Sequence, residues 1–384
     1  MKKSILLSLL LLFGIGQRLQ AQKKESWKQL VKEAEVLMTK KDYAEAADHY
    51  ERAWRQKEKK LNLAFLAAEN YYLNKDYRKA AELYQLLRDD AEDYPLLGLK
   101  YARSLKQDGQ YARATEAFEN FLNGYNGEGK AMLRDIISNE IVGCELGTQL
   151  PAQIDRAIEL VFPKGINTGN MEFGPVSAPD GTFFFSSDRG NIARIYRLEE
   201  RTDGSVVAKT PENFPVIQNG QYCHGSYSPD GERLYFTICA EENWDDVNTR
   251  CEIYCLTRLE NGWSTPQRLP DYINAAGKNS THPYAMFVGS EEWLIFSSNL
   301  EGGRGGMDLW YTKRSKDNPE AVFSEPVNLG PLVNTAGHEI TPFYDAGNEV
   351  LYFSSNGHIS IGGFDVFQTK GSGSSWSAVE NTGM

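Results

Sequence analysis

The sequence predicts a multidomain α + β protein, in which an N-terminal α-solenoid is followed by an all-β propeller of four-stranded blades. Three observations support this fold class. The first part of the chain repeats at a step of 34 residues. After Pro151 the residue composition and the spacing of apolar residues change, and a second repeat of 51 to 60 residues follows. Units that repeat in this way bury a continuous core by stacking on their neighbours. We therefore expect a signal segment over 1–21, a helical domain over 22–150 and a propeller over 151–384.

Composition places the chain among folded proteins and excludes one class of partner. Hydrophobic residues make up 41% of its 384 residues, which is ample for packed cores. The formal net charge is −11, whereas binding to phosphates needs concentrated Lys and Arg. We therefore expect no nucleic-acid partner, and we predict no cofactor.

The N-terminus has the three-part pattern of a secretory signal. Lys2 and Lys3 precede an apolar run from Ile5 to Phe13, and the small residue Ala21 follows. The run is shorter than the roughly 20 residues that a membrane-spanning helix needs, so we predict cleavage, with an uncleaved anchor as the alternative. The expected location is the periplasm of a Gram-negative bacterium, in association with the outer membrane.

The 34-residue repeat predicts three helical hairpins. Small residues in two columns allow paired helices to approach closely, and aromatic residues in two other columns fill the space between them. A further helix from Ala131 to Leu150 is expected to cover the open end of the array. The four columns are Ala34, Ala68 and Ala102; Ala46, Ala80 and Ala114; Tyr43, Tyr77 and Tyr111; and Tyr50, Tyr84 and Phe118.

These columns resemble the tetratricopeptide repeat family over residues 24–126, although the family's usual closing proline is missing. The resemblance implies a concave groove lined by the first helices of the hairpins. Phe65 and Tyr72 suit an extended peptide or a partner's helix, with Glu69 and Arg103 to orient it; alternatively, both rings pack against the neighbouring hairpin. The implied partner-binding residues are Asn62, Phe65, Glu69, Tyr72, Leu99, Arg103 and Lys106.

After Pro151, short alternating runs rich in Gly, Pro, Ser and aromatic residues predict β-strands. Phe185, Phe236, Phe296 and Phe353 stand at the same place in four units. Turns of the Pro-Asp-Gly type precede two of them, where Pro presets one turn position and Gly supplies the left-handed one. Another short strand follows in each unit and a fourth closes several units, as a propeller blade requires.

The second array resembles the WD40-like propeller repeats of the PD40 or TolB-like class over residues 158–384. This resemblance is specific for the fold and says little about function. At least four blades are present, and two interpretations stay open: a small closed propeller, and a truncated product of a longer protein. The segment from Ile158 to Ile166 is expected to be a strand that seals the ring.

Residues that could carry chemistry are few. The run from Gly302 to Asp308 lacks the Lys and the following helix of a phosphate loop. Its counterpart, Gly362 to Asp365, indicates a recurring hairpin whose aspartate bonds turn amides. His224 and His282 precede the same repeat position, on the strand that is expected to line the central channel of the propeller. Two interpretations are open: they bind a ligand or a metal, or they form hydrogen bonds to water and backbone. No third ligand repeats with them, and we predict no catalytic residue and no metal site.

Four of the five cysteines fall within one blade. Cys251 and Cys255 on one strand are about 13 Å apart, too far for a disulfide. Cys239 and Cys251 flank an acidic loop, Glu241 to Asp246, and are the pair that we expect to be bridged in an oxidising compartment.

The order of signal, tetratricopeptide-like array and PD40-type propeller resembles the N-terminal part of OmpA-family envelope proteins, among them the peptidoglycan-associated subunit of the type IX secretion system. The resemblance implies a non-enzymatic periplasmic scaffold that binds envelope or outer-membrane proteins. The OmpA-like domain is missing, so peptidoglycan binding is expected only if the intact protein has one. The alternatives are a propeller hydrolase or lyase that acts on glycan or peptide, and a propeller that senses a ligand or metal.

Overall fold

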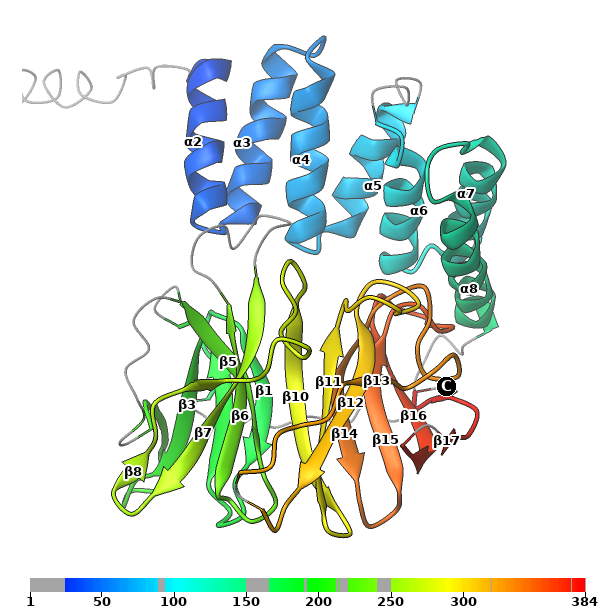
Figure 1. Ribbon diagram of the computed structural model, residues 1–384. Helices are drawn as coiled ribbons and strands as arrows, with labels where there is room; N and C mark the ends of the chain where they lie inside the picture. Colours follow the sequence, from blue (N-terminus) through cyan, green and yellow to red (C-terminus); the bar gives the residue numbers. More distant parts are fainter. Residues whose placement is uncertain are drawn as a thin grey trace, which may run out of the picture. The chain divides into compact units, whose positions relative to one another are not determined.

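The computed structural model describes residues 25–88, 94–149, 166–189, 192–211, 214, 220–239, 250–318, 320–373 and 375–383. The chain divides into two compact units, Met1–Gly127 and Glu128–Met384, and Figure 1 shows the elements of each. The predicted signal segment, and all but the last residue of the strand predicted over Ile158 to Ile166, lie outside the described residues. No helix in the described ranges is long and apolar enough to cross a membrane.

The first unit is a row of helices in which each helix packs on the next one along the chain (Figure 1). All six alanines of the two predicted columns are fully buried, so their small size is what lets the helices approach. A seventh helix, α8 (Lys130–Gln149), belongs to the second unit. The helices of the first unit are α2 (Trp27–Thr39), α3 (Tyr43–Gln56), α4 (Leu61–Leu73), α5 (Tyr77–Leu86), α6 (Leu97–Gln107) and α7 (Tyr111–Gly124).

The turns inside the hairpins follow the 34-residue step as well. Lys41, Lys75 and Gly109 have φ of 59°, 63° and 75°, in the left-handed region. A left-handed residue ends one helix and turns the chain toward the next. Asp42 and Asp76 then cap α3 and α5, because their carboxylates accept hydrogen bonds from amides of the first turn.

The second unit contains four antiparallel sheets, which are the blades of a propeller (Figure 1). The short strands β9 and β18 pair with the third strand of their blades. Blade 1 has β1 (Glu172–Ser177), β2 (Phe183–Ser187), β3 (Arg194–Glu200) and β4 (Val206–Lys209); blade 2 has β5 (Gln221–Tyr227), β6 (Arg233–Cys239), β7 (Cys251–Leu259), β8 (Gly262–Trp263) and β9 (Gln267–Arg268); blade 3 has β10 (Ser280–Val288), β11 (Glu291–Ser298), β12 (Asp308–Ser315) and β13 (Val327–Asn328); blade 4 has β14 (Glu339–Asp345), β15 (Val350–Ser355), β16 (Asp365–Ser372), β17 (Ser375–Trp376) and β18 (Glu380–Asn381).

Apolar cores join neighbouring blades. Phe184 and Ile195 of blade 1 pack with residues of blade 2, Tyr235 of blade 2 packs with Phe296 of blade 3, and a third core joins blades 3 and 4. The four repeated phenylalanines of the sequence are all buried. The predicted fold class, an α-solenoid followed by a propeller of four-stranded blades, is therefore confirmed, and the innermost strands β1, β5, β10 and β14 follow one another around the centre.

Candidate functional site

Each innermost strand has a β-bulge at the same point. Its pairing with the second strand of the blade shifts register there in all four blades. The residues at the bulge are Gly174, His224, His282 and Thr341, with φ of 56°, 52°, 51° and 53°. A left-handed backbone costs a residue other than glycine about 1–2 kcal/mol, and such residues cluster at functional sites. Three of the four blades thus hold strained backbone at one place.

The bulges surround a cavity of about 740 Å³, which we call the channel cavity. Its volume falls within the roughly 300–1,000 Å³ of small-molecule sites. Among the described residues that line it there is no Asp, Glu, Lys or Arg. The lining residues are 174–177, 179, 183, 224–229, 282–285 and 341–343.

Two histidines on neighbouring strands line this cavity. The rings of His224 and His282 lie with centroids 4.0 Å apart, and the ring of Phe173 lies 5.0 Å from that of His224. Burial lowers the pKa of His282 to about 4. Burial, and then the neighbouring His282, lower the pKa of His224 well below its usual range. Both imidazoles are therefore neutral at pH 7.

One imidazole nitrogen lacks a hydrogen-bond partner. Nδ1 of His282 is buried, and no described atom bonds to it. A neutral imidazole has one donor nitrogen and one acceptor nitrogen, and a buried polar atom without a partner costs about 1–3 kcal/mol. His282 lines the channel cavity, so a ligand hydroxyl or amide that reaches this nitrogen after a rotation of the imidazole would recover this energy.

An aromatic wall stands beside the histidines. Tyr284 and Phe343 each lie two residues after the left-handed residue of their strand, and their rings meet edge to face at 5.4 Å. Phe343 is 53% exposed. In blades 1 and 2 the same position holds the smaller Val176 and Ser226. At this position the lining is therefore asymmetric, with aromatic rings in blades 3 and 4 and smaller side chains in blades 1 and 2.

This arrangement suits hydrogen bonding and stacking to an uncharged molecule. Glycoside hydrolysis ordinarily uses two carboxylates, and the described lining supplies neither of them. Across the described part of the chain, no group of three or more His, Cys, Asp or Glu residues is placed to hold a metal ion.

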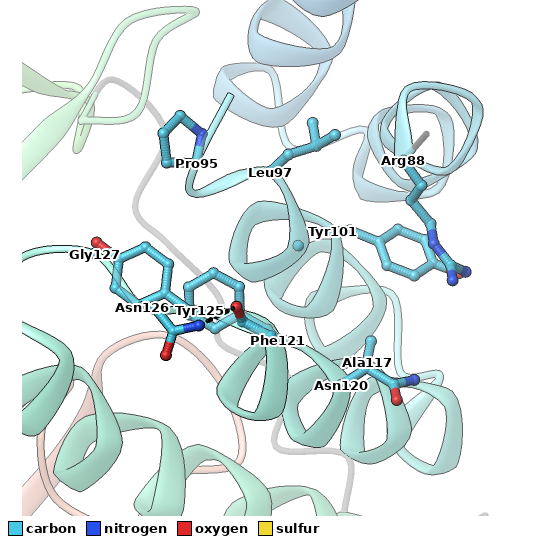
Figure 2. Close-up of a pocket in the computed structure, with 12 residues that line it drawn as sticks. Arg88, Pro95, Leu97, Tyr101, Ala117, Asn120, Phe121, Tyr125, Asn126 and Gly127 are labelled. Carbon is cyan, nitrogen blue, oxygen red and sulfur yellow. Dashed lines mark hydrogen bonds between the residues drawn. The ribbon is translucent and has the colours of Figure 1, made fainter. Parts of the chain in front are cut away.

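A second cavity, of about 600 Å³, lies in the helical unit (Figure 2). Tyr101 of α6 and Phe121 of α7 contribute to its wall, and Tyr125 stacks on Phe121 at 4.9 Å. The 34-residue column of Leu30 and Ala64 continues at Gly98. The missing side chain lets the ring of Phe121 pack directly against α6, because a Cβ on Gly98 would lie only 3.1 Å from Phe121.

The predicted groove residues are engaged within the helical unit. Phe65 stacks on Tyr94 at 4.2 Å, and Tyr72 meets Tyr77 edge to face at 5.3 Å. The Glu69 carboxylate accepts a hydrogen bond from Nζ of Lys100 at 2.6 Å. Asn62 is exposed and Arg103 is half-buried, whereas Leu99 and Lys106 are buried and offer almost no surface to a partner. A partner-binding role for these seven residues stays a prediction.

Cys239 and Cys251 form a disulfide that joins the ends of β6 and β7. This is the pair that the sequence favours, and the acidic loop Glu241 to Asp246 lies outside the described residues. Cys144, Cys223 and Cys255 are buried free thiols. Burial raises the pKa of Cys223 and Cys255 to about 12, so neither is a reactive thiolate.

The glycine-rich hairpins are structural, as the sequence indicates. The carboxylate of Asp308 accepts hydrogen bonds from the amides of Arg304 and Gly305. That of Asp365 accepts them from the amides of Ile361 and Gly362. These aspartates stabilise the turns of their own hairpins through these hydrogen bonds.

The sequence identifies the two histidines and misses the aromatic wall. The signal that could have found the wall is the recurrence of a proline followed by an aromatic residue, Pro283-Tyr284 and Pro342-Phe343, at matched positions of two repeats. Sequence spacing alone does not show that a bulge turns both rings toward the cavity.

Comparison with known proteins identifies folds and no family. No family of known proteins matches the chain, and no curated protein matches it. The chain is similar to the tetratricopeptide repeat domain of Sgt2 from Aspergillus fumigatus, with 20% identity, 35% of this chain and 91% of that one covered, and a TM-score of 0.26. It is similar to a thermostable family-43 glycoside hydrolase, with 11% identity, 54% and 73% coverage and a TM-score of 0.36. It is also similar to an α-L-arabinofuranosidase from Podospora anserina, with 15% identity, 58% and 72% coverage and a TM-score of 0.38.

The prediction that the protein is not an enzyme is contradicted at this point, because several of the solved structures that match the propeller are glycoside hydrolases. At such identities the likeness concerns the fold and identifies no catalytic residue in this chain. The helical unit resembles a tetratricopeptide repeat domain, and the sheets form a propeller of four blades.

Proposed function

We propose that the propeller is the functional module of this protein and that its channel cavity binds an uncharged organic ligand, of glycan or peptide type. The observation that carries this proposal is the combination of two neutral histidines, one with an unpartnered buried nitrogen, and a described lining without any charged side chain. Moving a charged group from water into such a cavity is costly. A neutral ligand avoids that cost and satisfies the nitrogen.

Ligand-observed NMR with the full chain tests this function. The probes are small neutral, anionic and cationic compounds of matched size. We expect the neutral set to bind and the charged sets not to bind. Phe343→Ala removes an exposed ring of the cavity, and His282→Asn removes the imidazole while keeping a residue that tolerates positive φ. Binding of neutral probes that neither variant weakens would place the site elsewhere.

Turnover is measured on the same samples. Release of reducing ends from neutral glycosides, and of amines from neutral peptides, separates a site that only binds from one that also hydrolyses. Activity that is present in the parent chain and lost in His282→Asn would assign the chemistry to the channel cavity.

We further propose that the helical unit binds a partner protein at the envelope, in a complex of the outer-membrane or type IX secretion kind. Support comes from the secretory pattern of Met1 to Gln22 and from the resemblance of the repeats to a protein-binding family. A photo-crosslinking residue at the exposed Asn62 tests this in intact cells. Crosslinks to envelope proteins, together with release of the mature chain by osmotic shock, are the expected result.

A further inference from the structure

Resting on the proposed function of the channel cavity, we propose that its ligand is a neutral glycan, one sugar ring of which stacks on Phe343 and donates or accepts a hydrogen bond at Nδ1 of His282. This goes beyond an uncharged ligand in general, since it selects glycan over peptide and assigns a role to each residue.

Phe343 is placed to stack on a flat, partly apolar ring. Its side chain is 53% exposed although it lines the cavity, and the edge-to-face contact with Tyr284 holds its orientation. The hydroxyl of Tyr284 donates to the carbonyl of Tyr344 at 2.8 Å, so this ring is fixed as well. The negative face of an aromatic ring attracts C–H groups that carry partial positive charge. A sugar ring has such a face.

The histidines then meet the edge of the sugar. A sugar hydroxyl both donates and accepts, so it satisfies Nδ1 of His282 in either tautomer. Because the two imidazoles are in contact and neutral, neither can compensate an anionic or a cationic sugar. Thr341 adds a hydroxyl, which donates to Oγ of Ser354 at 2.8 Å and keeps an oxygen able to accept.

A peptide fits this cavity less well. One common way to bind an extended peptide is to let its backbone add a strand to a sheet edge. Here three of the four bulges continue with Pro175, Pro283 and Pro342, which have no N–H to donate. The inner strands therefore cannot form a complete row of backbone hydrogen bonds with a peptide at the cavity. A sugar ring does not need such a row.

Isothermal titration calorimetry on the full chain tests the assignment. The neutral probes are cellotriose, maltotriose and tri-N-acetylchitotriose; the charged probes are trigalacturonate and the fully deacetylated chitosan trimer. We expect at least one neutral trisaccharide to bind and neither charged trisaccharide to bind. Phe343→Ala should weaken binding at least tenfold, and His282→Asn should weaken it as well.

Phe364→Ala is the matched control. Phe364 directly precedes β16 of the same blade and is 48% exposed. It does not line the channel cavity. We expect this variant to bind as the parent chain does. Equal losses in both phenylalanine variants would overturn the stacking role of Phe343.

The outcomes separate this inference from the function on which it rests. If no neutral trisaccharide binds while small neutral probes still bind in a manner that depends on Phe343, the glycan assignment is wrong and the neutral-ligand site stands. If neither kind of probe binds, both are wrong.

Discussion

The imidazole of His282 is neutral and its Nδ1 lacks a partner, and these two facts set what the channel cavity can bind. The sequence places His224 and His282 at equivalent repeat positions, which is enough to predict that they share the channel. It does not predict that their rings touch, because the contact depends on left-handed backbone at both bulges. Tyr284 and Phe343 are missed for the same reason.

The low pKa of His282 makes the stability of the protein depend on pH. In the unfolded chain this histidine takes up a proton near pH 6.5, whereas in the folded protein it does so only near pH 4. Between these values the unfolded state binds more protons, so the free energy of unfolding falls as the pH is lowered from about 6.5 to about 4. The loss due to this group approaches about 3.4 kcal/mol once the pH is well below 4.

Urea denaturation at pH 7.5 and pH 5 measures this effect, and the His282→Asn variant isolates it from carboxylate titration. The variant should lose less stability between the two pH values than the parent chain. An equal loss in both proteins would mean that His282 titrates normally in the folded state.

At the scale of elements, a buried ion pair network joins blades 2 and 3. The carboxylate of Glu292 is fully buried and lies 2.7 Å from Nη2 of Arg314 and 3.4 Å from Nη1 of Arg233. The hydroxyl of Tyr235 donates to it at 2.7 Å. Removing one member of such a network leaves buried charge unpaired.

We expect Glu292→Gln to lower the free energy of unfolding by about 3–5 kcal/mol. The neighbouring Glu291→Gln is the control, because Glu291 is more than a third exposed and its pair with Lys313 is worth about 1 kcal/mol or less. Denaturant titration followed by tryptophan fluorescence compares the two. Similar losses in both variants would contradict the account of Glu292.

The hairpin turns of the helical unit test a second element-scale argument. Gly109 has φ of 75° and open space around it, so Gly109→Ala should destabilise the unit by about 1 kcal/mol through backbone strain alone. Gly124 has no positive φ and also has open space, so Gly124→Ala should stabilise the unit by about 0.4–1 kcal/mol. Circular dichroism at 222 nm during thermal unfolding shows whether each variant has a lower or a higher Tm than the parent chain. A higher Tm for Gly109→Ala would contradict the assignment of Gly109 to a left-handed turn.

Across the whole molecule, two sequence periods predict the fold because each repeat must supply the same contacts to its neighbours. The 34-residue columns appear as buried alanines, and the repeated phenylalanines appear in the cores of the blades. The fourth strand of blade 1, β4, is not predicted, because it lacks a counterpart of Trp263-Ser264 and Trp376-Ser377, which mark the fourth strands of blades 2 and 4. The disulfide between Cys239 and Cys251 supports the proposal of export, since such bonds persist in oxidising compartments.

The redox state of the cysteines follows from this proposal. Protein purified from the periplasm and alkylated after denaturation should carry three labels, and five once it has been reduced first, as mass spectrometry would show. Replacing Cys239 and Cys251 together by serine should cost about 2–3 kcal/mol of stability. Five labels without reduction would show that the protein matures in a reducing compartment.

The central claim, that the channel cavity binds an uncharged ligand through His282 and Phe343, is tested most directly at the imidazole itself. A long-range ¹H–¹⁵N spectrum of the full chain resolves the ring nitrogens, and a neutral trisaccharide is titrated in at pH 7. The account predicts that Nδ1 of His282 shifts in step with the calorimetric binding curve and that Phe343→Ala abolishes the shift. Saturable binding that leaves the nitrogens of both His224 and His282 unmoved would contradict it.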